Sequence, residues 1–176
     1  MITTKEILIE AKKVKTKLAS LNTEKKNKAL LFMADALIEN SDEILTANKS
    51  DLEKAKGTIS DVMLDRLALT KERIEGMANG IKEVAALPDP VGKVLNRVER
   101  PNGIVIEKTT VPMGVTAIIY ESRPNVTSDA AALALKSGNV CVLRGGKEAF
   151  SSANAIVNAM RKGLNKLNLP ENFINL

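Results

Sequence analysis

One apolar run, residues 114–120, constrains the fold of this chain more than any other feature. It begins at Gly114, continues through β-branched side chains to Tyr120, and is followed at once by the polar segment 121–125. An unbroken apolar run of this length predicts a fully buried strand. Open α/β sheets present their ligand sites where a buried strand ends and the chain passes into a helix. We therefore expect chemistry at the carboxyl end of this strand.

Strands and helices alternate regularly from this run onward. The sequence predicts, in order, strand 114–120, helix 128–136, strand 139–143, helix 150–166 and a third strand from residue 173. This alternation indicates a parallel sheet with right-handed crossovers. Parallel sheets are normally covered on both faces, and the sequence stops inside a strand of this one. We therefore expect the chain to be part of a longer protein.

The first ninety residues are expected to form amphipathic helices, followed by a β-ribbon. Helix-start signals stand at Thr3 with Glu6 (a capping box), Thr23, Ser41, Ser60 and Thr70. Two prolines and a glycine in segment 87–92 end the helices. The Asn102-Gly103 pair, between apolar segments 94–100 and 104–111, then predicts a two-stranded ribbon. Such a ribbon either pairs subunits or is a plain surface hairpin.

Composition excludes several function classes. The net charge is +5, but aromatic residues make up only 2% of the chain, so stacking on single-stranded nucleic acid is not expected. Histidine is absent and Cys141 is the only cysteine, which excludes Ser-His or Cys-His activation within this chain and makes a zinc site improbable. No apolar run reaches the roughly 18 residues of a membrane span. We expect a cytoplasmic protein with no nucleic-acid or membrane partner and no metal.

The loop after the second strand is a candidate anion site. Arg144 and Lys147 supply positive charge, Gly145 and Gly146 permit close backbone approach, and the following helix N-terminus favours an anion. A nucleotide phosphate fits this pattern as well as an ordinary tight loop does. The segment is not a Walker loop, because Cys141 stands at its first glycine position. The chain also lacks a G-x-G-x-x-G fingerprint.

Single residues near the two loops have competing interpretations. Cys141 lies between two valines of a short strand, where burial would make its thiol inert. Asn125 could donate a hydrogen bond to a developing oxyanion or simply cap a helix. Glu121 and Arg123 could bind substrate, position a loop, or pair with each other.

Two long motifs carry a family resemblance. Segments 111–127 and 135–149 closely resemble the gamma-glutamyl phosphate reductase family, also called glutamate-5-semialdehyde dehydrogenases, of the aldehyde dehydrogenase superfamily. Asp65-Arg66-Leu67 and the ribbon turn 100–103 extend the resemblance to essentially the whole chain. It implies NADPH-dependent reduction of L-glutamyl 5-phosphate to L-glutamate 5-semialdehyde with release of phosphate, a step of proline biosynthesis.

The resemblance also implies roles for individual residues. Asn125 matches the asparagine that helps to form the family's oxyanion hole. Arg144, Gly145, Gly146 and Lys147 would contact the cofactor, with the cation at 147 suiting the 2′-phosphate of NADPH. Glu121, Ser122 and Arg123 would bind substrate. The family's catalytic cysteine is expected beyond residue 176, so the chain alone should be inactive.

The expected organisation is therefore an α/β fold in which helices and a ribbon lead into a Rossmann-like sheet. We expect residues 1–90 to be the helical part of a cofactor-binding domain, 91–112 the ribbon, and 113–176 the start of the NADP-binding sheet, with no catalytic domain. The complete protein is expected to be a homo-oligomer. Another aldehyde or acyl-phosphate dehydrogenase stays open as an alternative, as does a noncatalytic nucleotide-binding or association fragment.

Overall fold

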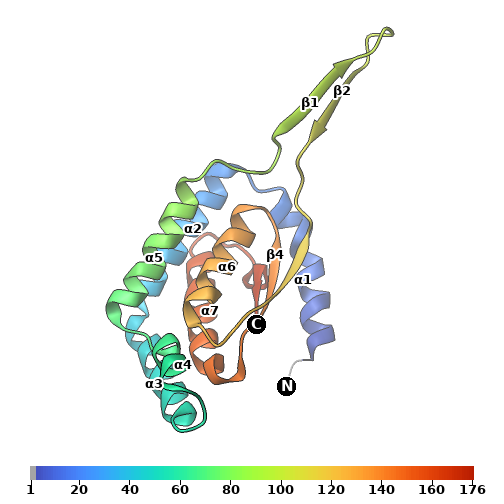
Figure 1. Ribbon diagram of the computed structural model, residues 1–176. Helices are drawn as coiled ribbons and strands as arrows, with labels where there is room; N and C mark the ends of the chain where they lie inside the picture. The colour runs from blue at the N-terminus through green and yellow to red at the C-terminus, as the bar shows by residue number, and fades with distance from the viewer. Residues whose placement is uncertain (1–2) are drawn as a thin grey trace.

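The body of the molecule is a small parallel sheet between layers of helices. The structure, a computed structural model, describes residues 3–176. Helix α1 (Thr4–Ala19) covers one face of the sheet, and α6 (Pro124–Lys136) and α7 (Phe150–Asn165) cover the other. Helices α2 (Thr23–Glu39) and α5 (Lys71–Ala86) form an outer layer over α6 and α7 (Figure 1). This confirms the predicted α/β class.

The sheet has the predicted parallel topology. Its strands β3 (Val115–Ile119), β4 (Val140–Arg144) and β5 (Ile174–Asn175) are ordered β3-β4-β5, with Val115 opposite Val140 and Cys141 opposite Ile174. Short 3₁₀ helices, η1 (Lys147–Ala149) and η2 (Glu171–Phe173), precede α7 and β5. All three strands end at the same edge of the sheet, which places the β3–α6 and β4–α7 loops beside each other.

The prediction that the 114–120 strand is fully buried is wrong. Strand β3 is only partly buried, and Ile119 is 83% exposed. The reason is topological, because within residues 3–176 β3 is an edge strand that pairs with β4 alone. Helices α1 and α6 pack more closely on β4, which is buried over most of its length. The apolar run therefore indicated the strand correctly, whereas its burial depends on what lies beside it.

Two helix starts also differ from the sequence prediction. Helix α6 begins at Pro124 rather than near residue 128, with the proline at a first-turn position where its fixed φ suits a helix. Asn125 therefore lies within the first turn of α6 and not before the helix. Helix α2 is capped by Asn22, whose Oδ1 accepts from the Lys25 amide at 2.9 Å, while Thr23 instead donates to Asp89.

Three other helices begin with the caps that the sequence predicts. The Thr3–Glu6 capping box is present at α1, and Ser60 and Thr70 cap α4 (Asp61–Leu67) and α5. Helix α3 (Ser41–Ala55) begins at the predicted serine and packs on α7. Apolar residues from the helices other than α4 and from the sheet form the main hydrophobic core, and Leu67 of α4 packs with Ala55 and Ala149 in a small second cluster. No helix within residues 3–176 is long and apolar enough to cross a membrane.

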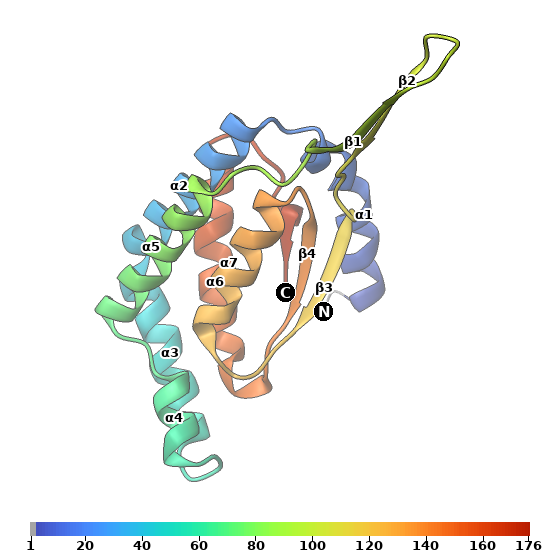
Figure 2. The ribbon, with the colours of Figure 1, turned by 45° about the horizontal axis from the view of Figure 1, so that its top comes forward.

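The predicted ribbon is present and projects away from the body. Strands β1 (Val94–Glu99) and β2 (Val105–Thr109) pair antiparallel and are exposed along their whole length. Figure 2 shows the ribbon at the end of the molecule opposite α4. Its base is held by Asp89, which receives hydrogen bonds from the buried Lys26 ammonium and from Thr23 Oγ1, each at 2.8 Å.

Candidate active site

The two loops at the carboxyl edge of the sheet are joined directly. Ser122 Oγ, from the β3–α6 loop, donates to Glu148 Oε2 in η1 at 2.6 Å, and this hydrogen bond lowers the pKa of Glu148. A Cβ on Gly146 would overlap Ser122 Oγ, and one on Gly145 would lie 3.1 Å from the Tyr120 ring. Glycine at both positions therefore serves packing, because it allows the β3–α6 loop to approach closely.

The N-terminus of α7 already holds an anion from the chain itself. The Asp51 carboxylate, on α3, accepts from the Ser151 amide at 3.2 Å and from the Ser152 amide and hydroxyl at 2.7 Å each. Asp51 and Ser152 are buried. The Ser151 and Ser152 amides are therefore satisfied by a carboxylate about 100 residues earlier in the chain, and a phosphate at the preceding loop stays a prediction.

We expect Asp51→Ala to lower the free energy of unfolding by about 3 kcal/mol, because it leaves two buried amides and a hydroxyl without their acceptor. Urea denaturation monitored by circular dichroism measures this change. Asp61→Ala, which removes an exposed first-turn acid of α4, is the matched control and should cost about 0.5 kcal/mol or less. Equal losses in the two variants would contradict the capping role of Asp51.

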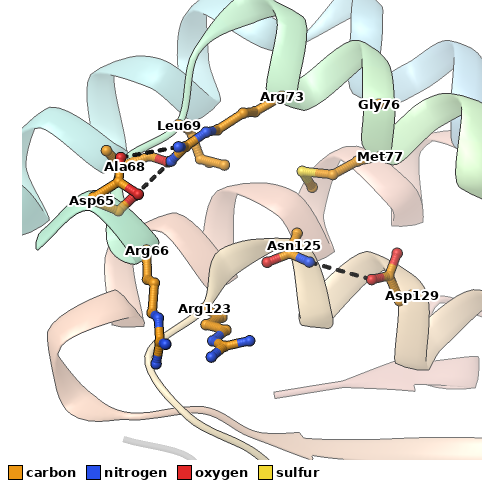
Figure 3. Close-up of a pocket in the computed structure, with 10 residues that line it drawn as sticks. All are labelled: Asp65, Arg66, Ala68, Leu69, Arg73, Gly76, Met77, Arg123, Asn125 and Asp129. Atoms are coloured by element: carbon orange, nitrogen blue, oxygen red, sulfur yellow. Dashed lines mark hydrogen bonds and ion pairs between the residues drawn. The ribbon is translucent and has the colours of Figure 1, made fainter. Parts of the chain in front are cut away.

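The N-terminus of α6, in contrast, opens into a pocket. This pocket has a volume of about 530 Å³ and lies between α5, α6 and the segment around α4. Arg123 precedes α6 and makes no side-chain cap hydrogen bond. Figure 3 shows the residues that line the pocket: Asp65, Arg66, Ala68, Leu69, Arg73, Gly76, Met77, Arg123, Asn125 and Asp129.

The arginines of this pocket differ in what holds them. Arg73 is fixed by Asp65, with Nη2 3.0 Å from the carboxylate and Nη1 donating to the Asp65 and Ala68 carbonyls. Arg66 and Arg123 both approach the exposed Glu121 carboxylate, at 3.9 and 3.2 Å. The Arg123 Nε is buried but is not aligned for a hydrogen bond. Pairing of Glu121 with Arg123, one of three roles that the sequence left open, is therefore present as a loose ion pair.

Asn125 presents its side-chain amide to this pocket. Its only side-chain hydrogen bond within residues 3–176 is a long one, from Nδ2 to Asp129 Oδ2 at 3.5 Å. Asp129 lies one helical turn further along α6. Burial raises the pKa of Asp129, and hydrogen bonds from Asn125 and Ser128 only partly offset this effect. The amide of Asn125 is thus available to an acceptor in the pocket.

The two cations of the β4–α7 loop lie apart from Asn125. The side chains of Arg144 and Lys147 are exposed, and neither forms an ion pair within the described part of the chain. Lys147 and Lys54 line a hollow of about 340 Å³ beside α3. A third hollow, of about 390 Å³, contains Glu121, Ser122, Arg123 and Gly146. Because Arg123 lines the first and third hollows, these two adjoin.

Cys141 has the inert environment that its position in the sequence predicts. It is fully buried in β4, and burial raises the pKa of its thiol to about 12. A protonated, enclosed thiol is neither a nucleophile nor a metal ligand. Among residues 3–176, no group of three or more His, Cys, Asp or Glu side chains could hold a metal ion.

Sequence reasoning did not assign a role to several pocket residues. Arg66 and Arg73 come from the α4–α5 region, whose contact with α6 is tertiary and leaves no local signal. Asp129 could have been found, because it follows Asn125 by four residues and so shares its helix face. The late predicted start of α6 concealed that spacing.

The chain is similar in sequence and in structure to proteins of known name. No family model matches the chain. Gamma-glutamyl phosphate reductase of Streptococcus pneumoniae (strain Hungary19A-6) is 54% identical over all 176 residues, which correspond to 42% of that protein. The chain therefore spans less than half the length of the curated relatives that it matches.

Solved structures agree with this match. The gamma-glutamyl phosphate reductase of Thermotoga maritima superposes with a TM-score of 0.92 at 44% identity, over 97% of this chain and 42% of that one. The Saccharomyces cerevisiae protein of the same name gives 0.91 at 36% identity, over 100% and 46%. A benzaldehyde dehydrogenase from Corynebacterium glutamicum, at 0.70 and 17% identity over 99% and 36%, shares the fold. The chain thus has the aldehyde dehydrogenase fold and is homologous over its whole length to part of gamma-glutamyl phosphate reductase.

Proposed function

We propose that this chain supplies the oxyanion-stabilising and cofactor-contacting part of a gamma-glutamyl phosphate reductase. The whole protein would reduce L-glutamyl 5-phosphate to L-glutamate 5-semialdehyde and phosphate, in proline biosynthesis. The observation that carries this proposal is the Asn125 amide, exposed on a pocket at the carboxyl end of β3 in a chain 54% identical to such reductases. An acyl phosphate needs such a donor when its carbonyl oxygen becomes negative.

The residues of this chain would act on the acyl group by position and charge. Asn125 Nδ2 would donate to the carbonyl oxygen as a thiolate attacks the carbonyl carbon and phosphate leaves. Arg66 and Arg123, which share the pocket with Asn125, would stabilise the departing phosphate. The thiolate would come from outside residues 1–176, because Cys141 is buried and protonated. The bound nicotinamide cofactor would supply the hydride that reduces the resulting acyl group.

The β4–α7 loop fits a cofactor phosphate in part. The exposed cations Arg144 and Lys147 suit an anion, whereas the α7 N-terminus is already satisfied by Asp51. We assign the ribose and 2′-phosphate of NADPH to Arg144 and Lys147, with Gly145 and Gly146 holding the loop between them. Two cations near the ribose favour NADPH over NADH, since only NADPH carries the extra phosphate.

The ribbon would serve association in the complete protein. Large apolar side chains are exposed on and beside β1 and β2: Val94, Leu95, Val98, Ile104, Val105 and Ile106. Exposed apolar edges of this kind are covered in stable proteins. We therefore propose a homo-oligomer that uses the ribbon, in the cytoplasm.

The reverse reaction of the full-length protein tests the proposed function. With L-glutamate 5-semialdehyde, inorganic phosphate and NADP⁺, we expect NADPH to form at 340 nm together with L-glutamyl 5-phosphate. Omitting phosphate should abolish the signal, and NAD⁺ should be the poorer oxidant. NADPH formation that proceeds equally without phosphate would instead indicate a hydrolytic aldehyde dehydrogenase.

A further inference from the structure

One acid in the large pocket lacks a cationic partner. Asp65 is paired with Arg73 at 3.0 Å, whereas Asp129 forms no ion pair among the residues that the structure describes. Its side chain accepts a long hydrogen bond from Asn125 Nδ2, at 3.5 Å. The Asp129 side chain is exposed on the pocket, and neighbouring protein atoms desolvate its carboxylate enough to raise its pKa. A cationic group in the pocket would relieve that cost.

Helix α5 carries two glycines near Asp129. Gly76 and Gly80 lie one turn apart on α5, so they share a face. A Cβ on Gly76 would meet no atom within 4 Å, and one on Gly80 would meet only Asp129 Oδ1, at 3.9 Å. Each glycine costs a helix about 1 kcal/mol relative to alanine. Because packing does not demand them, their effect is to keep space between α5 and α6 beside Asp129.

The spacing of Asn125 and Asp129 matches an amino acid with a reactive side-chain acyl group. The two residues are about 6 Å apart along the helix axis, and their facing side-chain atoms, Asn125 Nδ2 and Asp129 Oδ2, lie 3.5 Å apart. In a glutamyl group, four bonds of about 1.5 Å separate the acyl carbon from the amino nitrogen, so an extended chain spans about 5 Å. An acyl oxygen held by Asn125 therefore places the amino group within reach of Asp129.

We infer that Asp129 accepts the α-ammonium group of an amino-acid substrate whose acyl group is held at Asn125. This inference rests on the proposed function and assigns Asp129 as the residue that distinguishes an amino-acid acyl group from the same acid without its amine. Asn125 and Asp129 on α6 would hold the two ends of the substrate. The glycines of α5 would leave room for its methylene groups.

Two aldehydes that differ only in the amine test this assignment. The full-length protein would be assayed in the oxidative direction, with phosphate and NADP⁺, on L-glutamate 5-semialdehyde and on 5-oxopentanoate. Removing a charged hydrogen bond lowers kcat/KM by about 10- to 100-fold. We expect Asp129→Asn to show that loss for the amino aldehyde and a change within about threefold for 5-oxopentanoate. Cyclisation of the amino aldehyde lowers its open-chain concentration equally for every variant.

Two further variants keep the result interpretable. Asp129→Ser should repeat the selective loss with a smaller neutral side chain, and Asp61→Asn, on α4 and outside the pocket, should change neither substrate. Equal losses for both aldehydes, or no loss for either, would overturn the assignment while leaving the proposed function intact. A wild-type protein that oxidises neither aldehyde would overturn the proposed function and the assignment with it.

Discussion

Replacing Asn125 with alanine should lower kcat of the full-length protein by about 100- to 1,000-fold while KM changes by no more than about threefold. The Nδ2 group is exposed on the pocket and makes only a 3.5 Å hydrogen bond. Such a donor does little for the ground-state carbonyl but stabilises the oxyanion as negative charge develops. Steady-state kinetics with saturating NADP⁺ and phosphate separate the two parameters.

The structure also predicts that this variant folds normally. The Asn125 side chain is exposed, and the Ser128 hydroxyl donates to its backbone carbonyl, which the substitution retains. Asn154→Ala, in α7 and outside the three hollows, is the matched control and should keep full activity. A raised KM with unchanged kcat would show that Asn125 binds substrate uniformly and is not an oxyanion donor.

Gly163→Ala should destabilise the fold by about 3 kcal/mol, the largest stability effect that we expect from one methyl group. Helices α2 and α7 cross at this residue. A Cβ there would lie 2.6 Å from the Phe32 carbonyl oxygen and 2.8 Å from Met33 Cα and N. Because these are backbone atoms, no rotamer change relieves the overlap, and the helices must separate.

Gly76→Ala provides the matched comparison in α5. Its added methyl group meets no atom within 4 Å, so the higher helix propensity of alanine should stabilise the fold by about 0.5–1 kcal/mol. The midpoint of urea denaturation should therefore fall for Gly163→Ala and rise for Gly76→Ala. A similar shift for both glycines would refute the close approach of α2 and α7.

The fold was predictable wherever a signal is local. N-cap side chains marked the starts of α1, α4 and α5, Asn102-Gly103 marked the ribbon turn, and the strand–helix alternation indicated a parallel sheet. The burial of β3 was not predictable in the same way, because Ile119 looks identical in an edge strand and in a central one. Its exposure is set by the strand order, which is a property of the whole sheet.

For the same reason, only part of the candidate site was predictable from the sequence. The polar residues after β3 were predictable because a strand end and a helix start are both encoded nearby. The Asp51 cap on α7 was not, since it joins residues about 100 positions apart. Gly145 and Gly146 resembled a phosphate loop, yet their neighbours in the fold are Tyr120 and Ser122. A loop's local pattern shows that something approaches closely, and tertiary structure decides what it is.

Hydrogen–deuterium exchange on the full-length protein tests the location of the site most directly. NADPH and L-glutamate 5-semialdehyde form a complex that cannot react, because both are in the reduced form. We predict slower amide exchange in segments 120–129 and 144–150 when both ligands are bound, and unchanged exchange in the ribbon segment 94–109. Protection confined to other segments, with none at the carboxyl edge of β3 and β4, would contradict the assignment of this edge as the active site.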